Sequence, residues 1–211
     1  KGIAISEINL QSFYDASQVC VTQVTPYSGG SDINIFDTNT ALDTSQKIID
    51  NVRELLKGCR GYLPYTQGKY SLIIETTGSA SITLTEDDII GGYNLSIPTK
   101  NERYNRVIVG FVDPARNFQV NEIQYPAIDD SGYATADKHA TMKTADGGFL
   151  LEGRFSFSTI TSQYQAEEMA EVILRRSREA LSLGITVSLD AYDLAIGDIV
   201  NITHSSLGFS A

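Results

Sequence analysis

The stretch "YNRVIVGFVDPARNFQVNEIQYP", residues 104–126, decides the fold of this chain. Side chains of a strand alternate between its two faces, and both faces of the first half of this stretch are apolar. One face carries Val107, Val109 and Phe111, and the other carries Ile108, Gly110 and Val112. We therefore expect a strand that is buried on both sides, with its apolar side chains in the core.

This strand ends at Asp113-Pro114-Ala115-Arg116-Asn117. The composition is typical of a turn, because proline fixes φ and Asp and Asn bond readily to nearby backbone. A second strand is predicted for residues 118–125, so the two strands form a hairpin. Asp113 and Pro114 are assigned to a structural turn.

Length and charge limit the classes of function. The 211 residues, of which 42% are hydrophobic, can form one large domain or two of ordinary size with a real core. The net charge of −10 argues against nonspecific binding to nucleic acids or anionic membranes, which needs clustered Lys and Arg. No apolar run reaches the roughly 18 residues of a membrane helix. The chain begins at Lys1 and stops soon after a strand pattern, so we expect a fragment of a longer protein.

The first part of the chain predicts two helices and a hairpin. Ser6 can cap a helix of about 15 residues with Leu10, Phe13 and Tyr14 on one side, and a short strand follows at 33–36. A second helix begins at Asp43 or Thr44. Thr66-Gln67-Gly68-Lys69 is a hairpin turn between two short strands. The apolar stripe of the second helix has helical spacing and consists of Ile48, Ile49, Val52, Leu55, Leu56 and Cys59.

The second part is rich in strands and contains one clear helix. Ser162 and Gln165 form a capping-box pattern before a helix whose buried side includes Met169 and Ile173, and Gly184 follows its end. The expected strands lie at 93–97, at the hairpin described above, at 133–144 as a weaker candidate, and at 149–158, 185–189 and 199–203.

These elements predict an α+β protein of two domains. Residues 1–88 form a helix-strand-helix-hairpin domain, and residues 89–211 form a β-rich, barrel-like domain with antiparallel or mixed sheet and one packed helix. The boundary lies between Gly78 and Pro98, where the helix-containing half gives way to the β-rich half.

The sequence offers no recognisable catalytic or metal site. His139 and His204 have no nucleophile or ligand at a familiar spacing, and a surface role is expected for both. The segment from Asp37 begins like a calcium loop, but Leu42 stands where the obligatory Gly should be and Ile48 where the bidentate Glu should be. Cys20 and Cys59 are too far apart for a metal or redox motif, so free thiols are expected.

Two acidic clusters are the only carboxylate groupings with any claim to chemistry. Glu86-Asp87-Asp88 and Asp129-Asp130 could in principle supply a pair for glycoside hydrolysis or a metal site. Solvated turns are the simpler interpretation, because short acidic runs are common in loops. We therefore assign no catalytic, cofactor-binding or metal-binding residue.

Four stretches, taken in order, resemble one family: the tail tip attachment protein J of lambdoid phages. The stretch "NRVIVGFVDPARNFQVNEI" is the most specific, with its alternating Val, Asp-Pro turn and second strand. The resemblance covers roughly residues 7–203, but residues 129–148 align with nothing in the family. The other three stretches are "SFYDASQVC", "NVRELLKGCRGYLPYTQGKYSLIIE" and "AEEMAEVILRRSREALSLGITVSLDAYDLAIGDIVNI".

The resemblance implies a structural virion protein of the phage tail tip, built as a baseplate hub. It implies a homotrimer whose β domains close a ring under the tail tube, assembled in the host cytoplasm with distal tail and tape-measure proteins. Host receptors would be contacted through regions absent from these 211 residues. The apolar strand at 107–112 would then pack between its own helix and neighbouring strands of a barrel.

Two other functions stay open from the residues alone. A tail-associated enzyme that degrades polysaccharide or peptidoglycan would require a paired-carboxylate cleft. A carbohydrate-binding module could use the eleven tyrosines of the chain. A further hypothesis is that acidic residues such as Glu86, Asp87 and Asp88 line a lumen that repels passing DNA.

Overall fold

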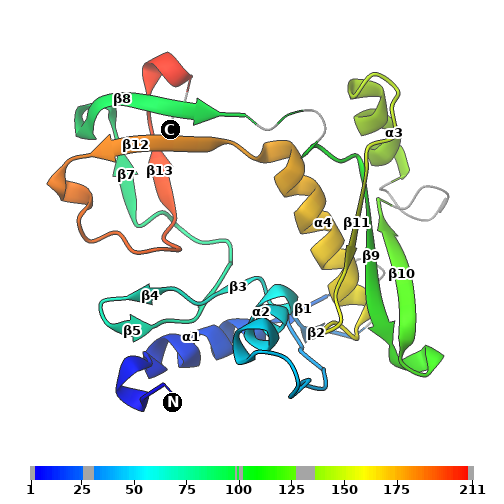
Figure 1. Ribbon diagram of the computed structural model, residues 1–211. Helices are drawn as coiled ribbons and strands as arrows, with labels where there is room; N and C mark the ends of the chain where they lie inside the picture. The colour runs from blue at the N-terminus through cyan, green and yellow to red at the C-terminus, as the bar shows by residue number, and fades with distance from the viewer. Residues whose placement is uncertain (1–2, 26–30, 98, 100–101, 127–135, 209–211) are drawn as a thin grey trace.

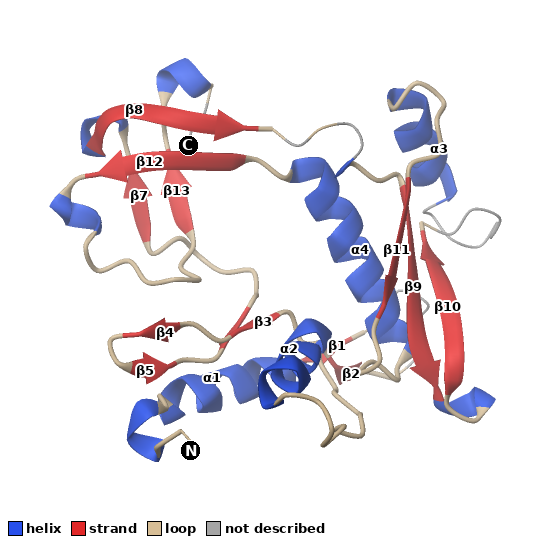
Figure 2. Cartoon of the chain, in the orientation of Figure 1, coloured by secondary structure: helices blue, strands red, loops and turns tan. Residues whose placement is uncertain are grey.

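The computed structural model describes residues 3–25, 31–97, 99, 102–126 and 136–208. Helices and small sheets are mixed along the chain, which confirms the predicted α+β class (Figures 1 and 2). The described strands form one three-stranded and five two-stranded sheets, and these sheets do not close into a barrel within the single chain.

The N-terminal part contains two helices and three small strand pairs (Figure 1). Helix α1 spans Leu10–Cys20 and α2 spans Ile48–Gly58. Apolar residues of α1, together with Cys59 after α2, gather around Ala16, Phe36 and Ile74, which form a small core of their own. Ile48 and Ile49, predicted to lie in the apolar stripe of α2, are exposed instead. The antiparallel pairs are β1 (Gln23–Val24) with β2 (Ile33–Asn34), β3 (Gly61–Tyr62) with β6 (Ile73–Ile74), and β4 (Tyr65–Thr66) with β5 (Lys69–Tyr70).

Both N-terminal helices begin later than predicted. Asn9, rather than Ser6, caps α1 and accepts a hydrogen bond from the Ser12 amide. Helix α2 begins at Ile48 because Asp43 makes a local turn, in which its carboxylate accepts from the Ser45 amide at 2.8 Å. The predicted hairpin turn is confirmed, with Gln67 and Gly68 both at positive φ.

The strand of the opening stretch is β9 (Arg106–Asp113), the middle strand of the order β10-β9-β11. Strand β10 (Gln119–Tyr125) pairs with it antiparallel, and β11 (Glu152–Ser156) pairs with it parallel. The turn at Asp113-Pro114 is a short 3-10 helix, Pro114–Arg116, in which the Asp113 carboxylate accepts from the Ala115 amide. The hairpin and its turn are therefore confirmed.

Helix α4 (Gln163–Glu179) covers one face of this sheet (Figure 1). Alanines at the contact let the helix approach the strands closely, and the packing forms the largest buried cluster of the described residues. Ile173 lies at its edge and is partly buried. The buried members are Val107, Val109, Phe111, Tyr125, Ile160, Ala166, Met169, Ala170 and Leu174.

The second face of β9 is buried in a different way from the one expected. Ile108 is only 5% exposed, yet among the described elements the helix that packs extensively on β9, α4, covers the face carrying Val107, Val109 and Phe111. Instead Arg154 of β11 reaches across the strand to Glu122 of β10, at 3.5 Å, and Arg154 also bonds Glu152 at 2.9 Å. Register places Arg154 beside Ile108 and Glu122 beside Gly110, so this ion pair covers the apolar strand.

The prediction of a weak strand at 133–144 is wrong. Residues 136–145 form helix α3 (Ala136–Ala145), as suits their alanine-rich composition. Met142 of this helix packs against the edge of the main cluster. Residues 127–135, which include Asp129 and Asp130, lie outside the described part of the chain.

The prediction of a capping box at the start of α4 is also wrong. Ser162 precedes the helix without a side-chain cap. Gln165 instead reaches the N-terminal part of the chain, donating to the Gly58 carbonyl at 3.1 Å and accepting from the Asp37 amide at 3.4 Å. Gln165 is 2% exposed, so this contact joins α4 to the end of α2 inside the protein.

A buried polar network fixes the other end of α4. Arg178 donates to both oxygens of the Asp146 carboxylate, at 2.8 and 3.3 Å, and to the Tyr104 carbonyl. Asn105, which is fully buried, donates to the same carboxylate at 3.0 Å. The network ties the start of β9 and the segment after α3 to the last turn of α4.

The last part of the structure consists of two strand pairs that cross each other (Figure 1). Strand β8 (Ile89–Ser96) pairs antiparallel with β12 (Ser182–Val187), and β7 (Ile82–Leu84) pairs parallel with β13 (Val200–Ile202). Gly184, predicted to end the preceding helix, lies inside β12 because α4 stops at Glu179. Strand β7 thus joins residues on both sides of the expected boundary near residue 88.

Candidate assembly surface

The ribbon formed by β8 and β12 has an apolar face that is only partly covered. Its paired positions include Leu95 opposite Leu183 and Tyr93 opposite Ile185, all on one face. The crossing strands cover part of this face, and the Tyr93 ring meets the His204 ring edge-on at 5.3 Å. Tyr93 nevertheless stays 43% exposed and Leu95 36%.

Exposure continues beyond the paired positions. Ile97, on the same face as Leu95, is 69% exposed, and seven of the eight β8 residues are exposed. A two-stranded ribbon is marginally stable by itself, and its outer edge presents unpaired backbone groups. The β8–β12 ribbon therefore has both an apolar face and a strand edge available for another chain.

The loop after β12 adds apolar side chains next to the ribbon. The Ser188 amide donates to the Asp88 carbonyl at 2.9 Å, which fixes the start of this loop against the segment before β8. Leu189 is 87% exposed and Tyr192 84%. Large side chains held this far into solvent are typical of contact surfaces.

The tip of the β9–β10 hairpin presents a second exposed aromatic. Phe118 is 69% exposed and has a φ of +58°, directly after Asn117 at +56°. Positive φ is costly for a bulky residue, so the backbone holds this side chain outward against its intrinsic preference. Val120, next along β10, is also exposed.

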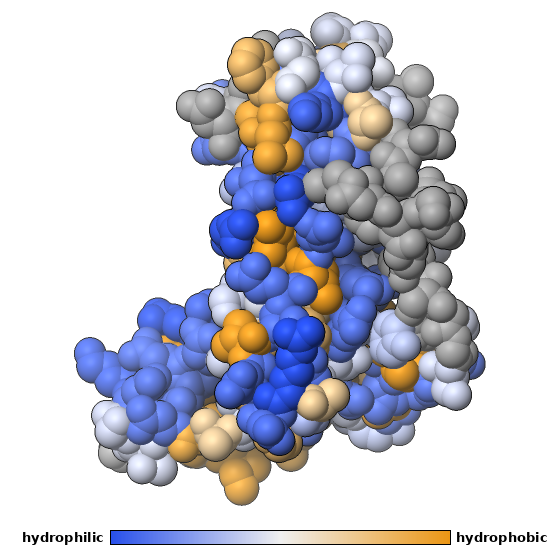
Figure 3. Space-filling view, turned by 90° about the vertical axis from the view of Figure 1, so that its right-hand side faces the viewer, coloured by the Kyte–Doolittle hydropathy of each residue, from blue (hydrophilic) through white to orange (hydrophobic). Residues whose placement is uncertain are grey.

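Away from the ribbon, exposed apolar residues lie in separate patches. Figure 3 views the molecule from the side of β9, β10 and α3, and hydrophobic residues there form separate patches within a largely hydrophilic surface. On α1, Leu10 and Tyr14 are exposed rather than packed, although they lie on one side as predicted. The β8–β12 ribbon and its loop bring several exposed apolar side chains together: Tyr93, Leu95, Ile97, Leu189 and Tyr192.

The acidic cluster Glu86-Asp87-Asp88 is a capped turn, as expected. Asp88 accepts hydrogen bonds from the amide and hydroxyl of Thr85, and these bonds lower the pKa of its carboxyl. Glu86 is bonded by the hydroxyl and the amide of Ser205, which lower its pKa in the same way. Both carboxylates are engaged in holding the turn.

The two histidines were expected at the surface, but both side chains are largely buried. His139 is 8% exposed, and its Nδ1–H donates to the Asn105 carbonyl at 2.9 Å. The expectation of a surface role was wrong because the surrounding segment is helix α3 rather than a polar loop. The His204 side chain is 12% exposed and lies 3.4 Å from Glu86.

The described residues bring no other catalytic or metal grouping together. Among them, no group of three His, Cys, Asp or Glu side chains could hold a metal ion. Cys20 and Cys59 are free thiols at the N-terminal core, and burial raises the pKa of both. Within the described segments, no helix has the length and apolar character needed to cross a membrane.

The chain is similar to proteins that are already known. Residues 47–209 match the family model Phage-tail_3, described as "Putative phage tail protein". The chain is 26% identical over 175 residues to the baseplate hub protein pb3 of Escherichia phage T5. That match covers 83% of this chain but 17% of the relative, so this chain spans about one sixth of that protein's length.

A solved structure shares the fold. It is titled "Virion of native gene transfer agent (GTA) particle", and it matches with a TM-score of 0.55 at 15% identity. The match covers 76% of this chain and 34% of the other chain.

Proposed function

Since the chain belongs to the family described as a phage tail protein, matched over residues 47–209, we propose that it is part of the baseplate hub at the tail tip. Its role is structural: it joins the tail tube to the host-recognition fibre and catalyses no reaction. The resemblance to tail tip attachment protein J favours this position at the end of the tail. The similarity to the T5 hub protein supports a hub rather than a tube or capsid role.

The observation that carries this proposal is the incomplete β8–β12 ribbon. Its apolar face and the adjoining loop keep Tyr93, Leu95 and Tyr192 exposed in a single chain. A ring of three copies would cover such a surface and pair the free strand edge, and it would complete the barrel that the described strands of one chain do not close. The two-domain division at residue 88, the homotrimer and the contacts with distal tail and tape-measure proteins belong to this proposal.

Immunogold electron microscopy of the virion tests this position. Antibodies raised against the purified chain should label the tail tip, and antibodies to a tail tube protein should label the shaft of the same particles. Gold along the shaft or on the capsid with the first antibody would contradict a hub role. Absence of the chain from purified virions would contradict a structural role of any kind.

A further inference from the structure

The two cysteines of the chain border the same small core, although they lie far apart in the sequence. Cys20 is the last residue of α1, and Cys59 directly follows the last residue of α2. Both side chains pack against the cluster of Ala16, Phe36 and Ile74. Because this cluster is so small, the two helix ends that carry the thiols lie near each other.

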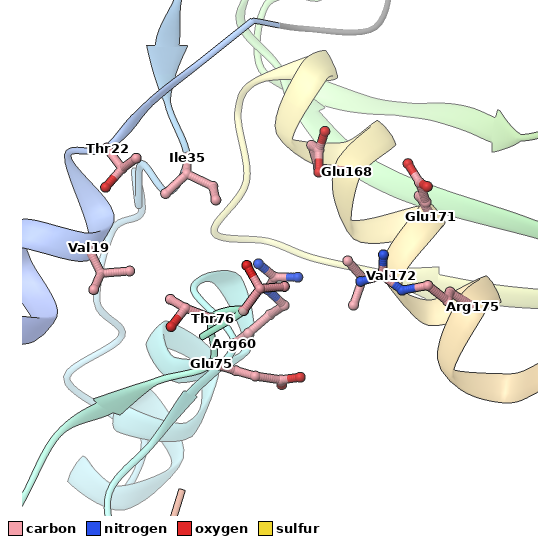
Figure 4. Close-up of a pocket in the computed structure, with 11 residues that line it drawn as sticks. Val19, Thr22, Ile35, Arg60, Glu75, Thr76, Glu168, Glu171, Val172 and Arg175 are labelled. Atoms are coloured by element: carbon pink, nitrogen blue, oxygen red, sulfur yellow. The ribbon is translucent and has the colours of Figure 1, made fainter. Parts of the chain in front are cut away.

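Phe36 connects the surroundings of both cysteines. Its amide donates to the Cys20 carbonyl at 3.3 Å. Arg60, the residue after Cys59, places its guanidinium 4.9 Å from the centroid of the Phe36 ring. Val19 and Arg60, the direct neighbours of the two cysteines, line the same pocket (Figure 4). Several independent contacts therefore bring the two positions together.

Both thiols are free in this structure and only partly buried, so a small oxidant can reach them. Burial raises the pKa of both thiols, and the charge of Cys59 raises that of Cys20 further because the two groups are close. The Cys59 thiol donates to the Leu55 and Leu56 carbonyls, at 3.6 Å each. A thiol is a weak donor, so rotation of this side chain toward Cys20 costs little.

The N-terminal part of the chain has few other stabilising contacts. Its described strand pairs contain two residues per strand, and its core has three buried residues. Small cores of this kind gain most from a covalent link. A bond between Cys20 and Cys59 would fasten the end of α1 to the end of α2, which is itself held on α4 where the Gly58 carbonyl accepts from Gln165.

We propose that Cys20 and Cys59 form a disulfide in an oxidising medium, and that this bond stabilises the N-terminal part. The oxidant is a small disulfide such as oxidised glutathione. One cysteine thiolate attacks its S–S bond and releases one glutathione thiol, and the other cysteine thiolate then displaces the second glutathione. The protein loses two protons and two electrons, and the oxidised glutathione gains both as it becomes two thiols.

The place of the chain in a virion gives this change its occasion. The cytosol keeps thiols reduced during assembly, whereas disulfides form and persist at virion surfaces. Only this timing rests on the proposed function. Formation of the bond can be measured on the isolated chain, whatever its oligomeric state.

The test is to incubate the purified chain with oxidised glutathione at mildly alkaline pH, where more of each thiol is ionised. Remaining thiols are then alkylated with N-ethylmaleimide in denaturant, and the chain is analysed by mass spectrometry without reduction. We expect a single chain that is two hydrogens lighter and carries no maleimide. Trypsin should release a fragment in which residues 2–47 are joined to residues 58–60.

Three outcomes would overturn the proposal. The first is a chain that still reacts with two maleimides after oxidation. The second is glutathione attached to both cysteines without a link between them. The third is a disulfide between two copies of the chain in place of the internal one, because the two thiols would then meet another copy more readily than each other.

Thermal unfolding measures whether the bond stabilises the fold. Oxidation should raise the midpoint of the wild type by about 5–10 °C, and a reducing agent should reverse the rise. Cys20→Ser and Cys59→Ser are the matched controls, and the same treatment should leave their midpoints unchanged. A bond that forms without raising the midpoint, or an equal rise in Cys20→Ser, would contradict the stabilising role.

The mass of the reduced chain in solution is measured separately and reports on the proposed trimer. A chain that forms the internal disulfide without forming trimers supports this proposal and counts against the hub assembly. A trimer whose two thiols stay reactive after oxidation supports the hub assembly and overturns the disulfide.

Discussion

At the residue scale, the best-defined polar contact is the buried pair of Arg178 and Asp146. Their side chains are 16% and 4% exposed, and Asn105 adds a third partner. Removing one member of a buried pair leaves the other charge without compensation, which costs more than the pair itself contributes. Both residues are therefore essential to the packing of α4.

Asp146→Asn should lower the free energy of unfolding by about 3 kcal/mol, because it leaves the buried Arg178 guanidinium without a negatively charged partner. Urea unfolding followed by circular dichroism measures this change. The matched control is Asp50→Asn, which breaks an exposed pair with Arg53 and should cost less than about 0.5 kcal/mol. Equal losses in the two variants would contradict a buried role for Asp146.

The same carboxylate makes stability depend on pH. The hydrogen bonds from Arg178 lower the pKa of Asp146 below its usual 3.8. Its contribution is therefore fully present above that value and is lost as the pH falls through the lowered folded pKa. The stability difference between wild type and Asp146→Asn, measured from pH 7 to pH 2.5, should shrink only below about pH 4. A constant difference over this range would be inconsistent with the assignment.

At the scale of elements, the contact between α2 and α4 depends on a missing side chain. A Cβ on Gly58 would overlap the Thr159 hydroxyl, and Thr159 is 1% exposed. The Gly58 carbonyl also accepts the Gln165 amide. Close backbone approach at this point thus holds the N-terminal part against the rest of the chain.

Gly58→Ala should destabilise the protein by about 1–3 kcal/mol, because the close-packed contact must open. Thermal unfolding by calorimetry reports the loss. Gly92→Ala on β8, where no atom lies within 4 Å of the added Cβ, should be neutral or slightly stabilising. A neutral Gly58→Ala variant would show that the two parts can separate without cost.

Local sequence patterns predicted the helices and strands better than the long-range contacts between them. The alternation at 107–112, the Asp-Pro turn and the stripe containing Met169 gave β9, its hairpin and α4, because each is fixed by nearby residues. The partner of Gln165 lies more than 100 positions away, and the cover of Ile108 depends on a register among three strands. Neither is encoded by local periodicity. Arg60 between two glycines, Gly58 and Gly61, was a local signal of an unusual helix end.

At the scale of the whole molecule, part of the exposed apolar surface lies on an incomplete two-stranded sheet. The β8–β12 ribbon, its loop and the Phe118 tip all present large apolar side chains to solvent. In a chain with net charge −10, these exposed apolar side chains favour specific association over nonspecific aggregation. The charge keeps copies apart except where the apolar surfaces meet.

Leu95→Glu should prevent self-association, since it places a charge in the centre of the apolar face of the ribbon. Asn94→Glu introduces the same charge at the neighbouring exposed position, which points to the opposite face, and should leave association unchanged. Sedimentation velocity at matched concentrations compares the two. Loss of association in both variants would argue against the specific face.

The central claim is that the β8–β12 ribbon joins copies of this chain into a hub. Light scattering coupled to size exclusion, over a wide concentration range, measures the mass directly. The account predicts a species of three chains, each of 23.0 kDa, that disappears in Leu95→Glu. A monomer at every concentration, with Tyr93 and Leu95 remaining accessible to solvent, would contradict it.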